Sequence, residues 1–201
     1  MSKEINFTPF QRIQLFLKYF LDRVLAFILL ILLLPLFIII ALLIYIDDGL
    51  PVFFIQERAG LNGKPFKMYK FRTFKVIQED KSINTYKGDP RITRVGRFLR
   101  ESSLDELPQL LNILLGHMSF VGPRPMLVQQ YEILDSFQKQ RALVKPGVTG
   151  LAQINGRNLI PWEKRIEYDL KYIENFSILL DFYILLKTFF VVLKREGVWE
   201  K

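Results

Sequence analysis

Residues 24–46 read VLAFILLILLLPLFIIIALLIYI, an uncharged run of 23 residues on which the rest of the fold depends. About 20 apolar residues in a helix span the hydrocarbon core of a bilayer, so this run is long enough to lie in a membrane. It is too long for the apolar part of a cleaved signal peptide, and no small-residue cleavage site follows it. The run therefore predicts a retained membrane segment.

Pro35 stands at the centre of this run, with 11 residues on each side. A proline inside a helix removes one backbone hydrogen bond and kinks or breaks the helix. Basic residues flank both ends of the run, and the positive-inside rule then places both ends in the cytoplasm. We predict a re-entrant helix–break–helix hairpin over residues 1–47. The alternative is an ordinary kinked transmembrane helix, since such helices tolerate proline.

Residues 48–201 predict a small, mostly helical cytosolic domain, so that the whole chain is of the α+β class. Residues 52–55 (VFFI) and 64–73 (KPFKMYKFRT) predict two strands, and the turn residues 61–63 (LNG) join them into a β-hairpin. The polar stretch 76–90 predicts a mobile loop.

The C-terminal part of the chain predicts two amphipathic helices. Residues 162–176 alternate polar and apolar positions with a helical period. Residues 178–192 are apolar but few for a membrane span, and they contain Asp181 and Lys187, which are costly at a bilayer centre. We expect this second helix to be buried against the domain or to lie in the membrane interface.

Composition excludes several kinds of chemistry. The chain has no cysteine and a single histidine, His117, so it offers no disulfide, no Cys-based nucleophile and no multi-histidine metal site. The formal charge is +8, and most of the excess lies between Arg58 and Arg100. Such a basic block suits nucleic acid, anionic lipid or phosphorylated small molecules.

Residues 101–108 (ESSLDELP) place two adjacent carboxylates, Asp105 and Glu106, after this basic block. Ser103 and Glu106 fit a helix capping box, and the apolar spacing that follows predicts a helix from about Asp105 to Gly116. Capping is one interpretation of the acidic pair. The other is chemical, because the start of a helix would keep a carboxylate ionised, as a nucleophile or metal ligand requires.

Arginines surround the acidic pair in the sequence. Arg91, Arg94, Arg97 and Arg100 recur every three residues and predict a stripe on one face of a helix, which is either solvated or turned toward a phosphate. Arg124 stands between two prolines in GPRP, which orders its guanidinium for a phosphate or carboxylate.

Clustered arginines beside a carboxylate pair suit a polyphosphate bound together with an oxygen-liganded divalent ion, most plausibly Mg²⁺. An aspartate can also attack phosphorus and form an acyl phosphate. The sequence has neither the P-loop pattern nor a G-x-G-x-x-G fingerprint.

Five motifs resemble the bacterial sugar transferase family, the monotopic phosphoglycosyl transferases that start glycan assembly on polyprenyl phosphate. They are YKFRT (69–73), GDPRITRVG (88–96), SLDELPQL (103–110), MSFVGPRP (118–125) and KPGVTG (145–150). The resemblance covers nearly the whole chain, from the apolar run to about residue 197, and the length is similar to that of the family's small, single-domain members.

The resemblance implies a reaction. Asp105 would attack the β-phosphate of a UDP-sugar, release UMP and hold a phosphosugar, which polyprenyl (undecaprenyl) phosphate then takes in a ping-pong step. Glu106 would assist, and Asp105 and Glu106 would bind Mg²⁺, with Asp181 as a further candidate ligand. The phosphate-binding residues implied are Lys70, Arg72, Arg100, Arg124 and Arg157.

The resemblance also implies a place in the cell and a set of partners. The catalytic domain would face the cytoplasm on the inner membrane of a bacterium, with lipid but no nucleic acid as a partner, and Pro35 would mark the membrane break. The product would feed capsule, O-antigen, exopolysaccharide or glycoprotein assembly. A homodimer and contacts with downstream glycosyltransferases stay open, as does the sugar. The alternative function is a non-catalytic, membrane-attached protein that binds anionic lipid through residues 58–100.

Overall fold

The apolar run folds into two helices, α1 (Pro9–Leu32) and α2 (Leu34–Asp48), which meet at Leu33. In this computed structural model, which describes residues 4–76, 86, 88–156 and 159–194, the two helices are bent by 63° at the break. Pro35 is the second residue of α2. Because proline has no N–H, it cannot bond the carbonyl four residues back, and the α1 ladder ends here.

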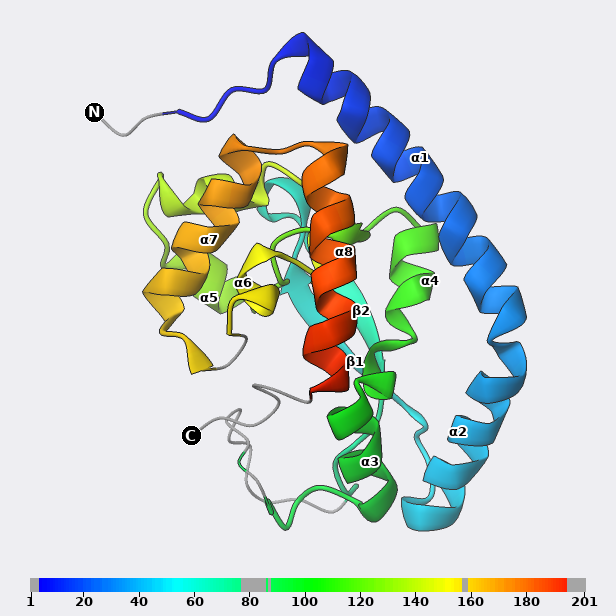
Figure 1. Cartoon of the computed structure of the whole chain (residues 1–201). Coiled ribbons are helices and arrows are strands. Elements are labelled where there is room, and N and C mark those ends of the chain that lie inside the picture. The colour runs from blue at the N-terminus through cyan, green and yellow to red at the C-terminus, as the bar shows by residue number, and fades with distance from the viewer. Residues whose placement is uncertain (1–3, 77–85, 87, 157–158, 195–201) are drawn as a thin grey trace.

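The predicted break is confirmed, but the helices do not fold back on each other as a tight hairpin. They form an elbow that runs along one side of the molecule (Figure 1). Within the described residues no single helix is both long and apolar enough to cross a membrane, whereas the bent pair α1–α2 meets that condition by length and composition when taken together.

The predicted hairpin is confirmed as β1 (Phe53–Ala59) and β2 (Pro65–Phe71), antiparallel from the pair Phe53–Phe71 to the pair Ala59–Pro65. The first strand ends four residues later than predicted, because the residues after Ile55 continue the ladder. A short 3₁₀ turn, Leu61–Gly63, joins the strands. The predicted mobile loop lies largely outside the described residues.

Helix α3 (Arg94–Ser102) is capped at its N-terminus by Thr93, whose hydroxyl accepts a hydrogen bond from the Gly96 N–H at 2.8 Å. Arg91 precedes the helix and binds the Asp89 carboxylate at 2.7 Å instead. The prediction of a four-arginine helical stripe is therefore wrong at Arg91. Arg94 and Arg97 are exposed on α3, and Arg100 is half-buried.

The predicted capping box at Ser103 is wrong. Ser103 is the left-handed residue (φ 58°) that ends α3, and its side chain caps nothing. Leu104–Glu106 form one 3₁₀ turn, and α4 (Gln109–Leu114) begins only after Pro108. Since Pro108 has no N–H for the Leu104 carbonyl, that carbonyl accepts from the Leu107 N–H, and the turn tightens.

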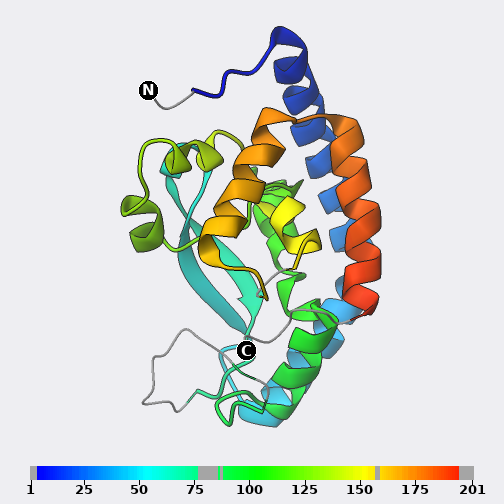
Figure 2. The same cartoon turned by 60° about the vertical axis from the view of Figure 1, so that its left-hand side comes forward.

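The remaining elements complete the domain around a second small sheet. Strands β3 (Ser119–Val121) and β4 (Gly147–Thr149) pair in parallel. The helices are α5 (Val128–Glu132), the 3₁₀ segment Gln138–Ala142, α6 (Leu151–Ile154), α7 (Trp162–Glu174) and α8 (Ile178–Leu193). The two predicted C-terminal helices are thus present, and Figure 2 shows α8 beside α1 at one edge of the molecule.

The core positions the site by fixing the elbow to the domain. Ala26 of α1 packs with Phe66 and Met68 of β2 and with Ile113 of α4. Farther along, Ile40 and Ile44 of α2 pack with Phe71 and with Leu99 of α3. One face of α8 packs inward through Ile184, while Phe182, Phe189 and Phe190 stay exposed.

Candidate active site

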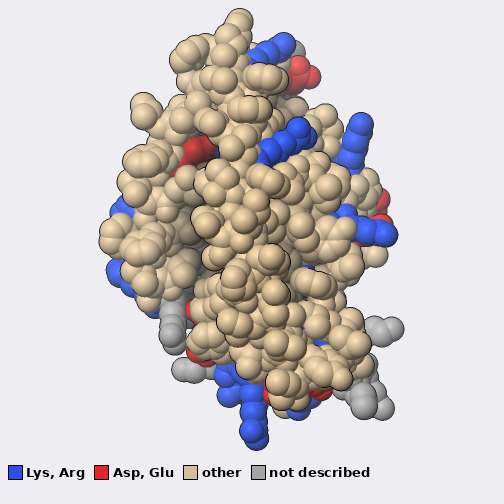
Figure 3. Space-filling model, turned by 90° about the vertical axis from the view of Figure 1, so that its right-hand side faces the viewer, with Lys and Arg blue, Asp and Glu red and all other residues tan. Residues whose placement is uncertain are grey.

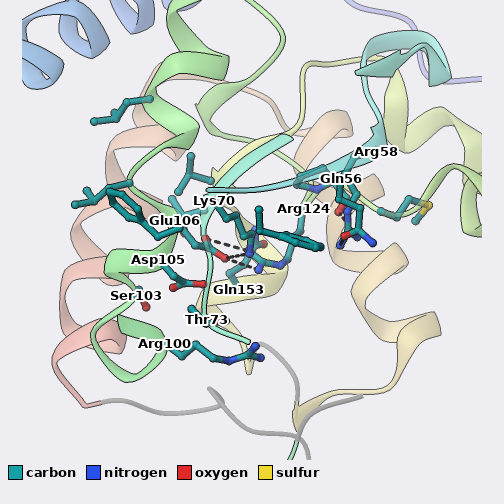
Figure 4. A pocket seen from close by; sticks show the side chains of 18 of the residues that line it. Gln56, Arg58, Lys70, Thr73, Arg100, Ser103, Asp105, Glu106, Arg124 and Gln153 are labelled. Carbon is teal, nitrogen blue, oxygen red and sulfur yellow. Dashed lines mark hydrogen bonds and ion pairs between the residues drawn. The ribbon is translucent and has the colours of Figure 1, made fainter. Parts of the chain in front are cut away.

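A cavity of about 940 Å³ opens between the β-hairpin, the Leu104–Glu106 turn, the Gly122–Pro125 loop and α6. Figure 4 shows the polar side chains that converge on it. The five motif segments come from distant parts of the sequence, and four of them supply lining residues: Lys70, Asp105, Glu106, Arg124 and Thr149. The acidic pair therefore lies in this cavity.

Glu106 is held between two cations. Its Oε1 accepts hydrogen bonds from Lys70 Nζ at 2.8 Å and from Arg124 Nη2 at 2.6 Å. Burial alone would raise the pKa of Glu106, but Arg124 and Lys70 outweigh burial and hold that pKa well below its usual range. Glu106 is consequently ionised and fixed in position.

Asp105 differs from its neighbour. Among the described residues its carboxylate has no hydrogen-bond or ion-pair partner, although Lys70, Arg100 and Arg124 act on it electrostatically. Burial raises the pKa of Asp105 to about 6, and the negative charge of Glu106 adds to that rise. The sequence predicted a helix start around Asp105, but the residue lies in a 3₁₀ turn, and burial is the main influence on its pKa. At neutral pH the carboxylate is still largely ionised.

Three of the predicted phosphate-binding residues, Lys70, Arg100 and Arg124, do line the cavity around the acidic pair. The Arg100 guanidinium lies 5.4 Å from the ring centre of Phe74, a cation–π distance. These cations give the cavity the positive charge that a diphosphate requires.

Arg72 also lines the cavity, but its guanidinium is used in the fold. It pairs with the Asp48 carboxylate and donates to the carbonyls of Pro51 at 2.5 Å and Gly49 at 2.6 Å. Arg72 thus ties the end of β2 to the end of α2. Arg157 lies outside the described residues.

Asp181 is not among the residues that line the cavity. It forms an ion pair of 2.6 Å with Lys18 of α1 and accepts a hydrogen bond of 2.7 Å from the Tyr172 hydroxyl. The structure therefore does not bring this candidate metal ligand to Asp105 and Glu106.

Sequence reasoning missed several polar residues of the cavity, among them Arg58 and Gln153. Phe54, Gln56 and Arg58 alternate along β1 and all line the cavity. This period of two was available in the sequence, but the strand was predicted to end at Ile55. Gln153 lies in the short helix α6, and no sequence pattern marked it as a site residue.

The donor set can be tested against Mg²⁺. The described residues contain no cluster of three or more His, Cys, Asp or Glu side chains that could hold a metal. Mg²⁺ usually needs only one or two carboxylates, with substrate phosphates and waters completing its shell. Asp105 and Glu106 therefore fit an ion that arrives with a diphosphate.

Comparison with known proteins identifies the family. The model of the bacterial sugar transferase family matches residues 13–195. The chain belongs to this family, as the motifs predicted.

Curated relatives make the family more specific. The chain is 51% identical over 150 residues to an uncharacterized sugar transferase, EpsL, of Bacillus subtilis, covering 75% of this chain and 74% of that protein. It is 45% identical over 192 residues to the UDP-glucose:undecaprenyl-phosphate glucose-1-phosphate transferase of Escherichia coli, covering 91% of this chain. The chain spans only 41% of the length of that second relative. It is also 41% identical to the exopolysaccharide production protein ExoY of Rhizobium meliloti, over 88% of this chain and 85% of that protein.

Proposed function

We propose that this protein transfers a sugar-1-phosphate from a UDP-sugar to polyprenyl phosphate, releasing UMP. The observation that carries the proposal is the unpaired Asp105 carboxylate, half-buried among Lys70, Arg100 and Arg124 in the cavity. Relatives whose names specify glucose-1-phosphate transfer to undecaprenyl phosphate support the same reaction.

In the first step an oxygen of Asp105 attacks the β-phosphorus of the UDP-sugar. The bond from that phosphorus to the bridging oxygen breaks, UMP leaves with the oxygen, and the sugar phosphate becomes an acyl phosphate on Asp105. Lys70, Arg100 and Arg124 stabilise the charge that gathers on the phosphate oxygens. Glu106, fixed by two of these cations, keeps them in place.

In the second step a phosphate oxygen of polyprenyl phosphate attacks the same phosphorus. The acyl–phosphate bond breaks, Asp105 recovers its carboxylate, and the product is a lipid diphosphate sugar. Because one carboxylate serves both steps, the two substrates react in turn, which is a ping-pong order.

Asp105 and Glu106 would hold Mg²⁺ together with the diphosphate. When bound, the ion would offset part of the diphosphate's negative charge.

The elbow supports a place for this reaction at the membrane. The face formed by α1 and α2 is almost free of charged side chains at its centre (Figure 3). Many large apolar side chains of the two helices are exposed, among them Phe16, Phe27, Ile39 and Ile46. Apolar surface of this extent marks a membrane or partner contact. We place the elbow in the inner leaflet as a re-entrant element, with the catalytic domain on the cytoplasmic side.

The cavity extends toward the break in the elbow. Leu29 and Leu33 are among its lining residues, as are Leu107, Leu110 and Val192. A lipid acceptor whose chain stays in the bilayer could therefore bring its phosphate to Asp105 along this apolar wall.

The identity of the leaving nucleotide tests the proposal. Purified protein is incubated with a panel of UDP-sugars, polyprenyl phosphate and Mg²⁺, and the nucleotide products are separated. UMP is expected together with a lipid diphosphate sugar. Release of UDP would mean that the sugar moves without its phosphate, and vesicle binding with neither nucleotide released would favour the non-catalytic lipid-binding alternative.

A further inference from the structure

Gln153 is a buried amide without a hydrogen-bond partner. It is 7% exposed and lines the cavity. Within the described part of the chain, neither its Nε2 nor its Oε1 has a partner. Figure 4 shows its side chain among those that converge on the cavity. Buried amides in folded proteins nearly always pair, so an unpaired one beside a cavity points to a ligand.

Gln153 lies close to the backbone of the loop that carries Arg124. A Cβ added to Gly150 would stand 2.2 Å from the Gly122 carbonyl oxygen and 2.9 Å from Gln153 Oε1. The amide oxygen therefore lies close to the carbonyl of Gly122, two residues before Arg124. Arg124 in turn binds Glu106, which places Gln153 near the phosphate-transfer centre.

The two open atoms define the chemistry of the ligand. Nε2 donates hydrogen bonds and Oε1 accepts them, whereas phosphate oxygens at neutral pH mostly accept. A phosphate alone would leave Oε1 unpaired. A hydroxyl group both donates and accepts, so neighbouring hydroxyls satisfy both atoms of the amide. In a UDP-sugar, the hydroxyls nearest to the attacked phosphorus belong to the hexose.

We propose that Gln153 is a specificity-determining residue that hydrogen-bonds the hydroxyls of the transferred hexose. This inference rests on the proposed phosphoglycosyl transfer. An enzyme that reads a hydroxyl with a buried polar group rejects sugars that lack it or turn it away, because the protein group is then left unpaired.

The test measures kcat/KM for UMP release with UDP-glucose, UDP-galactose and their N-acetyl derivatives. Gln153→Met keeps the approximate volume and removes both polar atoms, and Gln153→Glu keeps the acceptors and removes the donor. For the sugar that the wild type prefers, Gln153→Met should lower kcat/KM by about tenfold or more. For the poorest sugar the change should be small, so the preference collapses. Binding of UDP, measured by calorimetry, should stay within about twofold.

Gln109→Met is the matched control. Gln109 is also a buried amide with an unpartnered Nε2 in the described structure, but it does not line the cavity. Its substitution should leave the sugar preference at the wild-type ratio.

The assignment would be overturned if Gln153→Met and Gln153→Glu both kept the wild-type sugar preference. If one variant does not fold, the result from the other decides. An equal loss for every sugar together with weaker UDP binding would also overturn the assignment, because the amide would then contact the nucleotide. A wild type that releases no UMP from any UDP-sugar would instead overturn the proposed function.

Discussion

Two polar clusters lie in the same small domain, and they differ in how completely their hydrogen bonds are satisfied. The first joins α1 to α8 and β3 and consists of Lys18, Asp22, Ser119, Tyr172 and Asp181. Lys18 pairs with Asp181 at 2.6 Å, and the Ser119 hydroxyl donates to Asp22 at 2.6 Å. We call this the α1–α8 cluster.

The second cluster is the cavity, where polar atoms stay open. The Asp105 carboxylate has no hydrogen-bond or ion-pair partner in the described structure, and the unpartnered buried atoms found there include Arg58 Nε and both amide atoms of Gln153. Each cluster contains an acid that the sequence offered as a metal-ligand candidate, Asp181 in the first and Asp105 and Glu106 in the second. The comparison teaches that a closed cluster, whose polar atoms are paired with one another, stabilises the fold. An open cluster, which keeps unpaired polar atoms, can still bind a ligand.

The largest effect should come from the open acid. Asp105→Asn removes the nucleophile without disturbing a paired group, so UMP release should fall by at least about a thousandfold. The thermal unfolding temperature in detergent should not fall, because the variant breaks no hydrogen bond. Both quantities are measured on the same preparation, and activity within tenfold of the wild type would show that Asp105 is not the nucleophile.

Substitutions in the closed α1–α8 cluster should lower the stability of the fold. Asp181→Ala leaves the Lys18 ammonium, 6% exposed, without its 2.6 Å partner. Breaking a buried pair in this way should lower the free energy of unfolding by about 3 kcal/mol. Denaturant or thermal unfolding in detergent measures the loss.

The double variant Lys18→Met/Asp181→Leu is the control for this second prediction. It removes both charges and should recover much of the lost stability. A single variant as stable as the wild type would contradict the structural role of the α1–α8 cluster.

A smaller effect is expected at the cation that fixes Glu106. Arg124→Ala removes one of the two cations that bind Glu106, together with a positive charge that faces the phosphate. It should lower kcat for UMP release by about a hundredfold. Arg97→Ala removes an exposed arginine on α3 that does not line the cavity, and should leave kcat unchanged. An equal loss of kcat in both variants would mean that Arg124 acts only through its positive charge and not through its position in the cavity.

The smallest effect concerns pH. Because burial raises the pKa of Asp105 to about 6, the reactive carboxylate is lost as the pH falls through that value. The rate of the first step should be about halved near pH 6 and fall tenfold per unit below it. Lys70 lowers the pKa of Asp105, so Lys70→Met should move this acid limb to higher pH. An acid limb that Lys70→Met leaves in place would contradict the assignment.

Much of the fold was predictable because periodicity and backbone chemistry are local. The apolar run, Pro35 and the hairpin turn each act through the residues beside them. The capping box failed for a reason that is also local, since Pro108 withholds an N–H and tightens the turn before α4. The 63° bend, in contrast, depends on packing against α3 and α4, which sequence pattern does not contain.

The site was predictable where a residue's chemistry stands out. Asp105, Glu106, Lys70 and Arg124 lie in recognisable motifs, and the structure brings them together. Arg72 and Asp181 have the same kind of charge but are used within the fold. A sequence cannot separate these cases, because the difference lies in which partners are close in space. Gln153 was missed for the same reason, since only burial without a partner makes an amide conspicuous.

The most direct test of the open acid is a half-reaction without the lipid acceptor. The protein is mixed with a UDP-sugar and Mg²⁺ alone, quenched in acid and analysed by mass spectrometry. The account predicts a burst of UMP no larger than the amount of protein, and a peptide containing Asp105 that gains the mass of a sugar phosphate. Release of UMP only when polyprenyl phosphate is also present, with no mass gain on that peptide, would contradict it.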